Sequence, residues 1–140
     1  MVVLCKPEDA MDWYNKMWSY TVEFFRSLDV SVRILECCSG DLADLKVKSC
    51  DIEAWSPRQK KYFEVGSCST LGDAQARRLG IRMKTENGNK YLATLNNTVV
   101  ASPRSLIAIL EQHYQKDGSV IIPEVLRPYM GGKERIEVKR

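Results

Sequence analysis

Apolar residues recur at spacings of three and four near the start of the chain, which predicts an amphipathic helix over residues 7–28. Pro7 suits the first turn of this helix, and the acidic Glu8 and Asp9 suit its positive end. The apolar positions form one stripe, which we expect to pack against a core. The stripe consists of Met11, Tyr14, Trp18, Thr21 or Val22, Phe25 and Leu28.

The pattern then changes to alternating and β-branched residues bounded by turn signals, which is typical of strands. Three strands are expected, over residues 30–38, 48–55 and 61–69. A short helical turn is expected over 42–45. The turn at 56–59 is short, so the second and third strands should pair antiparallel. Residues 72–80 should be irregular or partly helical.

A hairpin is expected next, with strands over residues 81–85 and 90–100. The run Glu86-Asn87-Gly88-Asn89 joins them, and its Asn-Gly pair is a strong turn signal. A short strand over 120–122 follows further on. The charged residues 133–140 are expected to fray.

A second helix is predicted between these strands, over residues 103–115. Ser102 suits its N-cap and Pro103 its first position. Its expected buried face consists of Leu106, Ile107, Ile109, Leu110 and Tyr114. A helix, several antiparallel strands and a helix across them make an α+β fold, without a glycine-rich phosphate loop.

Composition narrows the function classes only a little. The length of 140 residues suits one domain, and the net charge of +3 is too small to indicate nucleic-acid binding by itself. No apolar run approaches the length of a membrane span, and the N-terminus lacks a signal-peptide pattern. We therefore expect no membrane partner and a cytoplasmic location.

Five cysteines are present, an odd number with no chelating spacing, which argues against a disulfide framework. The only histidine is His113, so a zinc site is disfavoured and the thiols are expected to be buried and reduced. His113 lies near a helix end, where a cap or an exposed position is expected. The sequence spacing identifies no serine or cysteine as a partner for His113, so a catalytic triad is not indicated.

Three segments could carry chemistry. The strand over 90–100 runs into Ser102-Pro103-Arg104, where a helix N-terminus and a guanidinium could bind an anion such as a triphosphate. A solvated arginine is the alternative. Asn96-Asn97-Thr98 places two amides and a hydroxyl in an apolar strand, which suits either a small polar ligand or cross-strand hydrogen bonding.

The third segment is Glu64-Val65-Gly66-Ser67. A strand carboxylate and a nearby hydroxyl can hold Mg²⁺ through oxygen atoms. Residues three apart in a regular strand point to opposite faces, so Glu64 and Ser67 converge only if Gly66 permits a bulge. A surface glutamate without a ligand is the alternative.

Several runs, in the same order, resemble the seryl-tRNA synthetase family of class II aminoacyl-tRNA synthetases. They span about ninety residues, from Lys48 to Gly132, with one further run just before them. These runs are CSGDL at 38–42, CDIEAWSP at 50–57, FEVGSCS at 63–69, DAQARR at 73–78, TLNNT at 94–98, PR at 103–104 and IPEVLRPYM at 122–130. Residues 1–30 are similar to the helix after the family's second motif.

The resemblance implies an ATP-dependent ligase that activates serine and transfers it to tRNA-Ser. It assigns ATP binding to the segment from Glu64 through Val65 and Gly66 to Ser67, with Glu64 and Ser67 on Mg²⁺. Arg104 is the arginine that holds the γ-phosphate, and Glu64 and Arg104 are the catalytic pair. Thr98 and Asn96 face serine. Gly66 departs from the family's usual serine and removes one side-chain oxygen.

The resemblance also implies an N-terminally incomplete class II antiparallel sheet. Residues 1–132 form the C-terminal part of the catalytic domain and 133–140 a charged tail. The family's first two motifs, which supply its homodimer interface and α-phosphate arginine, are not matched, so the chain is expected to be inactive alone. Two alternatives remain open: a non-catalytic paralogue that binds nucleotide or a partner, and a carrier-protein aminoacyl ligase.

Overall fold

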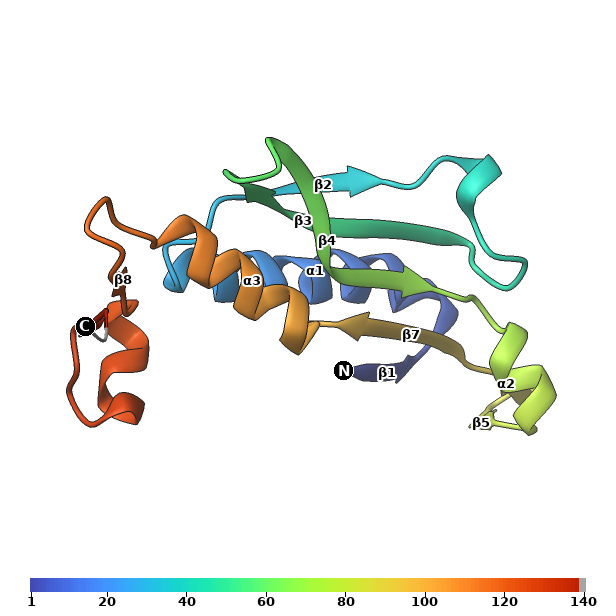
Figure 1. Ribbon diagram of the computed structural model, residues 1–140. Helices are drawn as coiled ribbons and strands as arrows, with labels where there is room; N and C mark the ends of the chain where they lie inside the picture. Colours follow the sequence, from blue (N-terminus) through green and yellow to red (C-terminus); the bar gives the residue numbers. More distant parts are fainter. Residues whose placement is uncertain (139–140) are drawn as a thin grey trace.

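A five-stranded antiparallel sheet forms the centre of the computed structural model, which describes residues 1–138 (Figure 1). Its strands stand in the order β1-β7-β4-β3-β2. Their bounds are Val2–Cys5 for β1, Val32–Glu36 for β2, Lys48–Ser56 for β3, Lys61–Thr70 for β4 and Ala93–Thr98 for β7. The expected α+β fold and the antiparallel pairing of β3 with β4 are confirmed. Strand β1 was not expected, because four residues are too few for a periodic signal.

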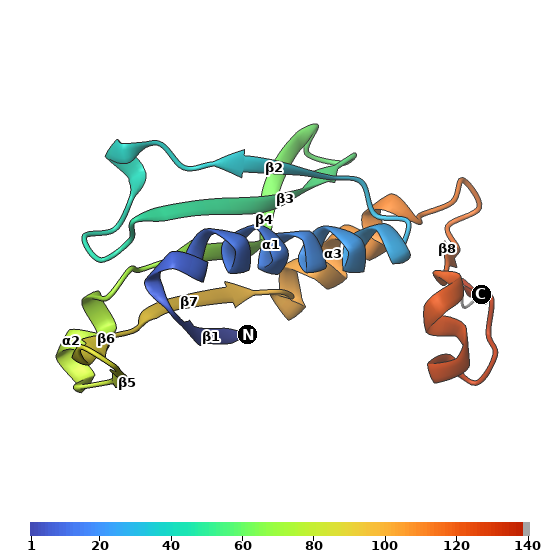
Figure 2. The ribbon, with the colours of Figure 1, turned by 180° about the vertical axis from the view of Figure 1, so that it is seen from behind.

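The helix α1 spans Ala10–Ser27 after a short 3-10 turn, η1, at Pro7–Asp9, and it lies along the sheet (Figure 2). Its stripe is confirmed over most of its length. Two positions differ from the prediction: Met11 is exposed and Met17 is fully buried. The face of α1 that contacts the sheet starts at Ala10 and continues at spacings of four and three, so Met11 lies at its edge. The buried positions of the helix are Ala10, Tyr14, Met17, Thr21, Val22 and Phe25.

Asn97 is the main polar link between α1 and the sheet. Its side chain is 2% exposed, and its amide nitrogen donates to the Met17 carbonyl at 2.6 Å and to the Thr21 hydroxyl at 2.9 Å. A buried amide is stable only when its hydrogen bonds are made. The Asn97 amide therefore has a structural role, but its partners lie on α1 and not on a neighbouring strand, as the cross-strand alternative had expected.

The helix α3 spans Ser102–Gln112 and packs on the same side of the sheet as α1. The Ser56 hydroxyl, buried at the end of β3, donates to Glu111, and the Arg58 guanidinium lies 3.0 Å from the same carboxylate. The Gln112 amide donates to the Trp55 carbonyl at 2.9 Å. These polar contacts hold the C-terminal end of α3 against the β3–β4 turn.

The predicted buried face of α3 is largely wrong. Ser105 and Ala108 are the buried positions, because small side chains let the helix approach the core closely. Four of the five apolar residues expected inside are exposed, and only Ile109 is partly buried against the core. The exposed four are Leu106, Ile107, Leu110 and Tyr114.

The ends of α3 differ in part from the prediction. The helix begins at Ser102 itself, and Ala101 takes the N-cap position without a side-chain hydrogen bond. It ends at Gln112. His113 is its C-cap, which is one of the two roles expected for this residue. The His113 Nε2 atom lies 2.8 Å from the Leu28 carbonyl, which ties α3 to the end of α1.

The single strand expected over 90–100 is two separate strands. β6, Gly88–Tyr91, pairs with β5, Arg82–Thr85, in a small sheet of its own, whereas β7 joins the main sheet. The helix α2, Ala74–Leu79, lies within the segment expected to be partly helical. The helical turn, η2, falls at Ser39–Asp41 rather than at 42–45.

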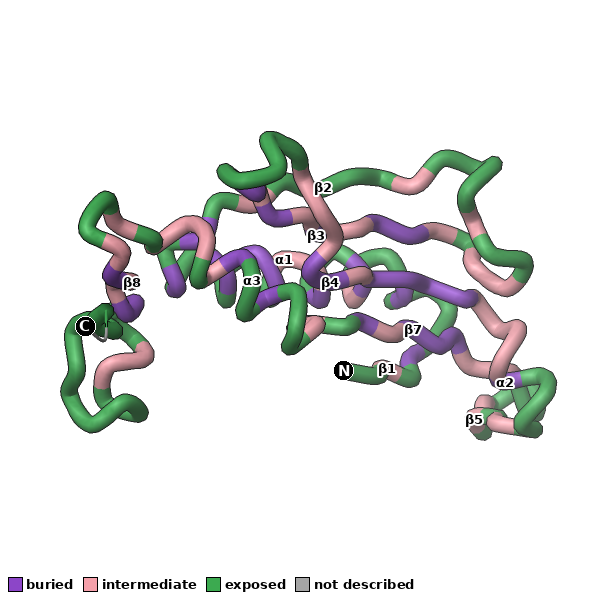
Figure 3. Tube along the Cα trace, in the orientation of Figure 1, coloured by how far each residue is buried: buried purple, intermediate pink, exposed green. Residues whose placement is uncertain are grey.

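The C-terminal segment lies beyond the end of α3, away from the main sheet, and is mostly exposed or half-buried (Figures 1 and 3). It contains β8, Val120–Ile121, the 3-10 helix η3, Glu124–Met130, and β9, Arg135–Ile136. Because β9 pairs with β8, the expected fraying of residues 133–140 is wrong at this strand. Residues 139 and 140 lie outside the described part.

The cysteines follow the buried-thiol prediction only in part. Cys5, Cys50 and Cys68 are buried, Cys37 is half-buried and Cys38 is exposed. Burial raises the pKa of the Cys68 thiol to about 12, which makes it unreactive. Within residues 1–138, no helix combines the length and apolar character that a bilayer crossing requires.

We predict that Asn97→Ala lowers the free energy of unfolding by about 1–3 kcal/mol, because it leaves buried partners on α1 without a hydrogen bond. The matched control is Asn89→Ala, on the exposed strand β6, which should change it by less than about 0.5 kcal/mol. Urea unfolding of both variants measures the difference. Equal losses would show that Asn97 is not a structural link.

Glu111 makes the stability dependent on pH. The Ser56 hydroxyl, and then Arg58, lower the pKa of the Glu111 carboxyl below its ordinary value of 4.5. Its contribution to stability is therefore present above 4.5 and is lost as the pH falls through the lower, folded pKa. Unfolding free energies of wild type and Glu111→Gln should differ at neutral pH and converge below that value. A gap that does not change with pH contradicts this account.

Candidate functional site

A β-bulge in β4 shapes the centre of the sheet. Ile52 on β3 pairs with Gly66, but the next residue, Glu53, pairs with Glu64. Val65 is therefore an extra residue with no partner on β3. Sequence reasoning had placed the possible bulge at Gly66, and the structure places it one residue earlier.

The bulge brings Glu64 and Ser67 to the same face of the sheet. Ser67 stands opposite Asp51, and Glu64 stands opposite Glu53. Directly opposed residues of antiparallel strands share a face, and so do residues two apart, such as Asp51 and Glu53. Without the extra residue, Glu64 and Ser67 would point to opposite faces, so the condition for their convergence is met.

This face lies away from α1 and α3, and we call it the open face. The helix side is identified by Gly66, where an added Cβ would lie 3.2 Å from the Thr21 methyl group on α1, and by Cys68, whose thiol contacts the Tyr14 carbonyl. Neighbouring side chains of a strand alternate, so the positions between them belong to the open face. The open face includes Asp51, Glu53, Glu64, Ser67, Asn96 and Thr98.

Strand β7 contributes two predicted site residues to this face. Thr98 stands opposite Ser67, and Asn96 stands opposite Ser69. Thr98 is exposed and Asn96 is half-buried, so their polar groups can reach a ligand. Asn97, between them, points to the helix side and is used by α1.

Arg104, in the first turn of α3, reaches Glu64. Its Nη1 atom lies 2.8 Å from a carboxylate oxygen, and the two side chains are 46% and 37% exposed. The Ala101 N–H donates to the Val65 carbonyl at 2.9 Å, so the bulge also anchors the start of α3. A water-exposed ion pair is weak. The guanidinium can therefore exchange the carboxylate for phosphate oxygens at small cost.

Gly66 is required by close packing on the helix side. A Cβ at this position would lie 2.6 Å from the Thr98 carbonyl oxygen, which is too close for any side chain. The family's usual serine would therefore point away from the open face in this arrangement. The expectation that Gly66 removes an oxygen from an ATP site on that face does not fit this geometry.

The donors of the open face suit a hard cation that shares its ligands with phosphate. Mg²⁺ usually takes one or two protein carboxylates and completes its shell with water and phosphate oxygens. Glu64 and Ser67 supply such oxygens, and Asp51, opposite Ser67, adds a carboxylate that sequence reasoning missed. Strand register was needed to find it. Within residues 1–138, no three His, Cys, Asp or Glu side chains gather closely enough to hold a metal by themselves.

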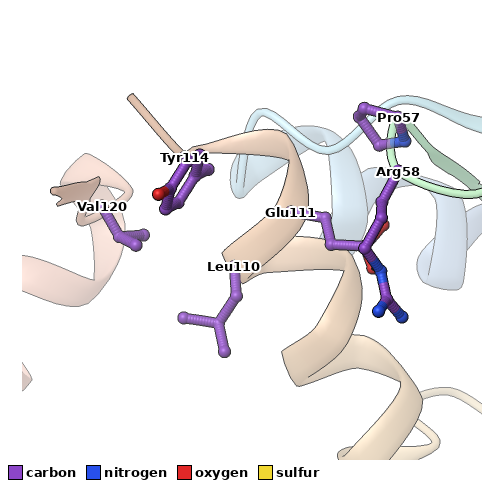
Figure 4. Close-up of a pocket in the computed structure, with 6 residues that line it drawn as sticks. All are labelled: Pro57, Arg58, Leu110, Glu111, Tyr114 and Val120. Atoms are coloured by element: carbon purple, nitrogen blue, oxygen red, sulfur yellow. The ribbon is translucent and has the colours of Figure 1, made fainter. Parts of the chain in front are cut away.

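A separate hollow of about 620 Å³ lies at the C-terminal end of α3 (Figure 4). It is lined by Pro57, Arg58, Leu110, Glu111, Tyr114 and Val120, which come from the β3–β4 turn, α3 and β8. None of the predicted site residues lines it. Its walls are apolar apart from the Arg58–Glu111 ion pair, so it has no charge left for a phosphate.

Comparison with known proteins identifies relatives of this chain. Residues 1–113 match the family described as the tRNA synthetase class II core domain (G, H, P, S and T). The chain is 45% identical to a serine–tRNA ligase of Deinococcus radiodurans, over 94% of this chain and 32% of that protein. It is 46% identical to one of Geobacter sp. (strain M21), over 97% and 33%. The chain thus spans about a third of the length of the curated relatives it matches.

Solved structures agree with the fold. The crystal structure of seryl-tRNA synthetase from Pyrococcus horikoshii complexed with ATP has a TM-score of 0.95 and 40% identity, covering 99% of this chain and 31% of that one. The cytoplasmic serine–tRNA ligase from Naegleria fowleri, in complex with AMP, has a TM-score of 0.90 and 33% identity, covering 99% and 33%.

We predict that Gly66→Ser disturbs the link between β7 and α3, because the new Cβ meets the Thr98 backbone rather than a mobile side chain. The expected loss of stability is about 1–3 kcal/mol, as for overpacking. Gly40→Ser is the matched control, since nothing lies within 4 Å of a Cβ there. Thermal unfolding of both variants checks this. Equal melting temperatures would contradict the close approach at Gly66.

Proposed function

The chain belongs to the tRNA synthetase class II core domain family, and from this premise we propose that it is the ATP- and serine-binding part of a serine–tRNA ligase. Its relatives in Deinococcus radiodurans and Geobacter sp. (strain M21) bear that name, and a relative of similar fold was crystallised with ATP. The observation that carries the proposal is the bulge, which gathers Glu64, Ser67, Thr98 and Arg104 around one face.

ATP is proposed to bind along the open face with its γ-phosphate on Arg104. The exposed Arg104–Glu64 pair holds the guanidinium in place before the nucleotide arrives. Glu64 and Ser67, with Val65 and Gly66 between them, form the phosphate-facing segment of β4, and Asp51 stands across from Ser67. Mg²⁺ bound by Glu64 and Ser67 would neutralise phosphate charge there.

Serine is proposed to bind beside the phosphates, at Thr98 and Asn96. Its hydroxyl and ammonium groups match the hydroxyl and amide that these residues present. The serine carboxylate attacks the α-phosphorus of ATP, pyrophosphate leaves, and seryl-adenylate forms. The 3′-terminal hydroxyl of tRNA-Ser then attacks the seryl carbonyl and releases AMP.

Both steps depend on alignment and charge neutralisation rather than on a protein nucleophile. His113 contacts the Leu28 carbonyl and has a structural role in this account. Arg104 and Glu64 are the proposed catalytic residues. A homodimer in the cytoplasm, acting in protein biosynthesis, is the setting that we propose for the whole enzyme.

The test replaces the matching third of the Pyrococcus horikoshii enzyme with this chain and measures serine-dependent exchange between ATP and pyrophosphate. The hybrid is expected to be active, and Arg104→Gln should lower the exchange rate by about 10²–10³-fold, as for loss of a preorganised charge. Arg26→Gln, an exposed arginine on α1, removes the same charge and should leave the rate unchanged.

Equal effects of the two substitutions would contradict the role of Arg104. A hybrid that binds ATP but catalyses no exchange would favour the non-catalytic paralogue. The chain alone, measured beside the hybrid, should show no exchange, and activity in it would contradict the expectation that it is inactive alone.

A further inference from the structure

The excursion between β4 and β7 carries all of the chain's net charge. Residues 73–91, called the basic unit here, comprise the turn before α2, α2 itself and the β5–β6 hairpin. They contain five Lys or Arg and two Asp or Glu, out of 21 and 18 in the whole chain. Basic and acidic residues are therefore equal in number, 16 each, in the remainder. The chain's small net charge of +3 is therefore concentrated in the basic unit.

The charges of the basic unit are exposed and mostly unneutralised. Its five basic side chains are Arg77, Arg78, Arg82, Lys84 and Lys90, and all are exposed. Only Arg77 pairs with a carboxylate, that of Asp73 at 2.7 Å, within the part of the chain that the structure describes. Elsewhere in the described part of the chain, six basic residues make ion pairs, among them Arg33 with Glu53 and Arg58 with Glu111. The basic unit therefore carries a net charge of +3, and four of its five basic side chains make no ion pair within residues 1–138.

Two of these arginines are held in fixed positions by an aromatic ring. The Arg77 and Arg82 guanidinium carbons lie 4.8 and 4.9 Å from the centre of the Tyr91 ring. Arg82 also donates to the Tyr91 hydroxyl at 2.9 Å. Such cation–π stacking reduces the entropy lost when a guanidinium binds. Arginine beside an aromatic ring is a combination that suits nucleic-acid phosphates and unstacked bases.

The basic unit stands at one end of the open face. The Thr94 hydroxyl donates to the Gln75 side chain of α2 at 2.9 Å, and Thr94 shares its face of β7 with Asn96 and Thr98. Arg104 follows the opposite end of β7, and Figures 1 and 2 show α2 and the start of α3 at the two ends of this strand. Thr94 and Thr98 are separated by ~13 Å of extended strand.

We propose that the basic unit binds the phosphate backbone of RNA and guides the 3′ end of an acceptor strand onto the open face. The inference rests on the proposed function, because a tRNA ligase must bring an RNA end to the adenylate. A backbone that crosses Arg78, Arg82 and Lys84 would lie one short strand away from Thr98 and Arg104. The contact is electrostatic and so independent of base sequence.

The test measures binding of the 140-residue chain to a fluorescent RNA hairpin with a single-stranded 3′ end, between about 50 and 200 mM KCl. The variant Arg78→Gln, Lys84→Gln and Lys90→Gln removes three charges that make no ion pair within residues 1–138, so folding should be kept, as circular dichroism can verify. The control variant removes three exposed charges elsewhere, with Lys60→Gln, Lys61→Gln and Lys116→Gln.

The basic-unit variant should weaken RNA binding by tenfold or more and reduce the slope of log affinity against log salt by about 2–3. The control should change that slope by less than about 1. Equal losses in both variants would overturn the proposal, since net charge alone would then explain binding. Binding of polyglutamate with the same affinity and the same dependence on the basic unit would also overturn it, in favour of an acidic protein.

ATP binding, measured on the same three proteins, separates this inference from the proposed function. If ATP binds equally to all three but RNA binding does not depend on the basic unit, the RNA contact alone is wrong. If the hybrid with the Pyrococcus horikoshii enzyme shows no exchange while RNA binding by the chain still depends on the basic unit, the ligase proposal is wrong and the RNA contact stands.

Discussion

The extra residue at Val65 is the constraint on which the rest of the site depends. It turns Glu64 to the face that carries Ser67 and Asp51, and its carbonyl accepts the Ala101 N–H at 2.9 Å. The same irregularity therefore sets the direction of a strand carboxylate and the position of the helix that delivers Arg104. Gly66 suits this arrangement, because a Cβ there would lie 2.6 Å from the Thr98 carbonyl oxygen and the β7–α3 connection would have to shift away from β4.

The two faces of the sheet carry different kinds of interaction. The helix side is mostly apolar, and the buried Asn97 amide there is satisfied by α1. The six residues named on the open face are half-buried or exposed, so burial penalises their polar groups less. The two ends of β7 also differ, since Arg104, the proposed anion-binding residue, lies beyond one end and the basic unit lies beyond the other. Chemistry on the open face can thus vary without disturbing the core.

Local pattern was enough to predict most elements, and motif order was enough to predict the family. The stripe of α1 and the β3–β4 hairpin follow from spacing, because each is a contact between near neighbours. The orientation of α3 could not be predicted, since Ser105 and Ala108 are buried for their size and not for their hydrophobicity. Asp51 and the separation of β6 from β7 depend on strand register, which one sequence does not display.

A crystal structure of the chain with ATP and Mg²⁺ tests the central claim most directly. The account predicts electron density for the triphosphate on the open face, with the γ-phosphate on Arg104 and the metal between the phosphates, Glu64 and Ser67. The Arg104–Glu64 ion pair, with its 2.8 Å separation, should be opened or shared with phosphate. Nucleotide bound in the hollow beside Leu110 and Tyr114, or on the helix side of the sheet, would contradict it.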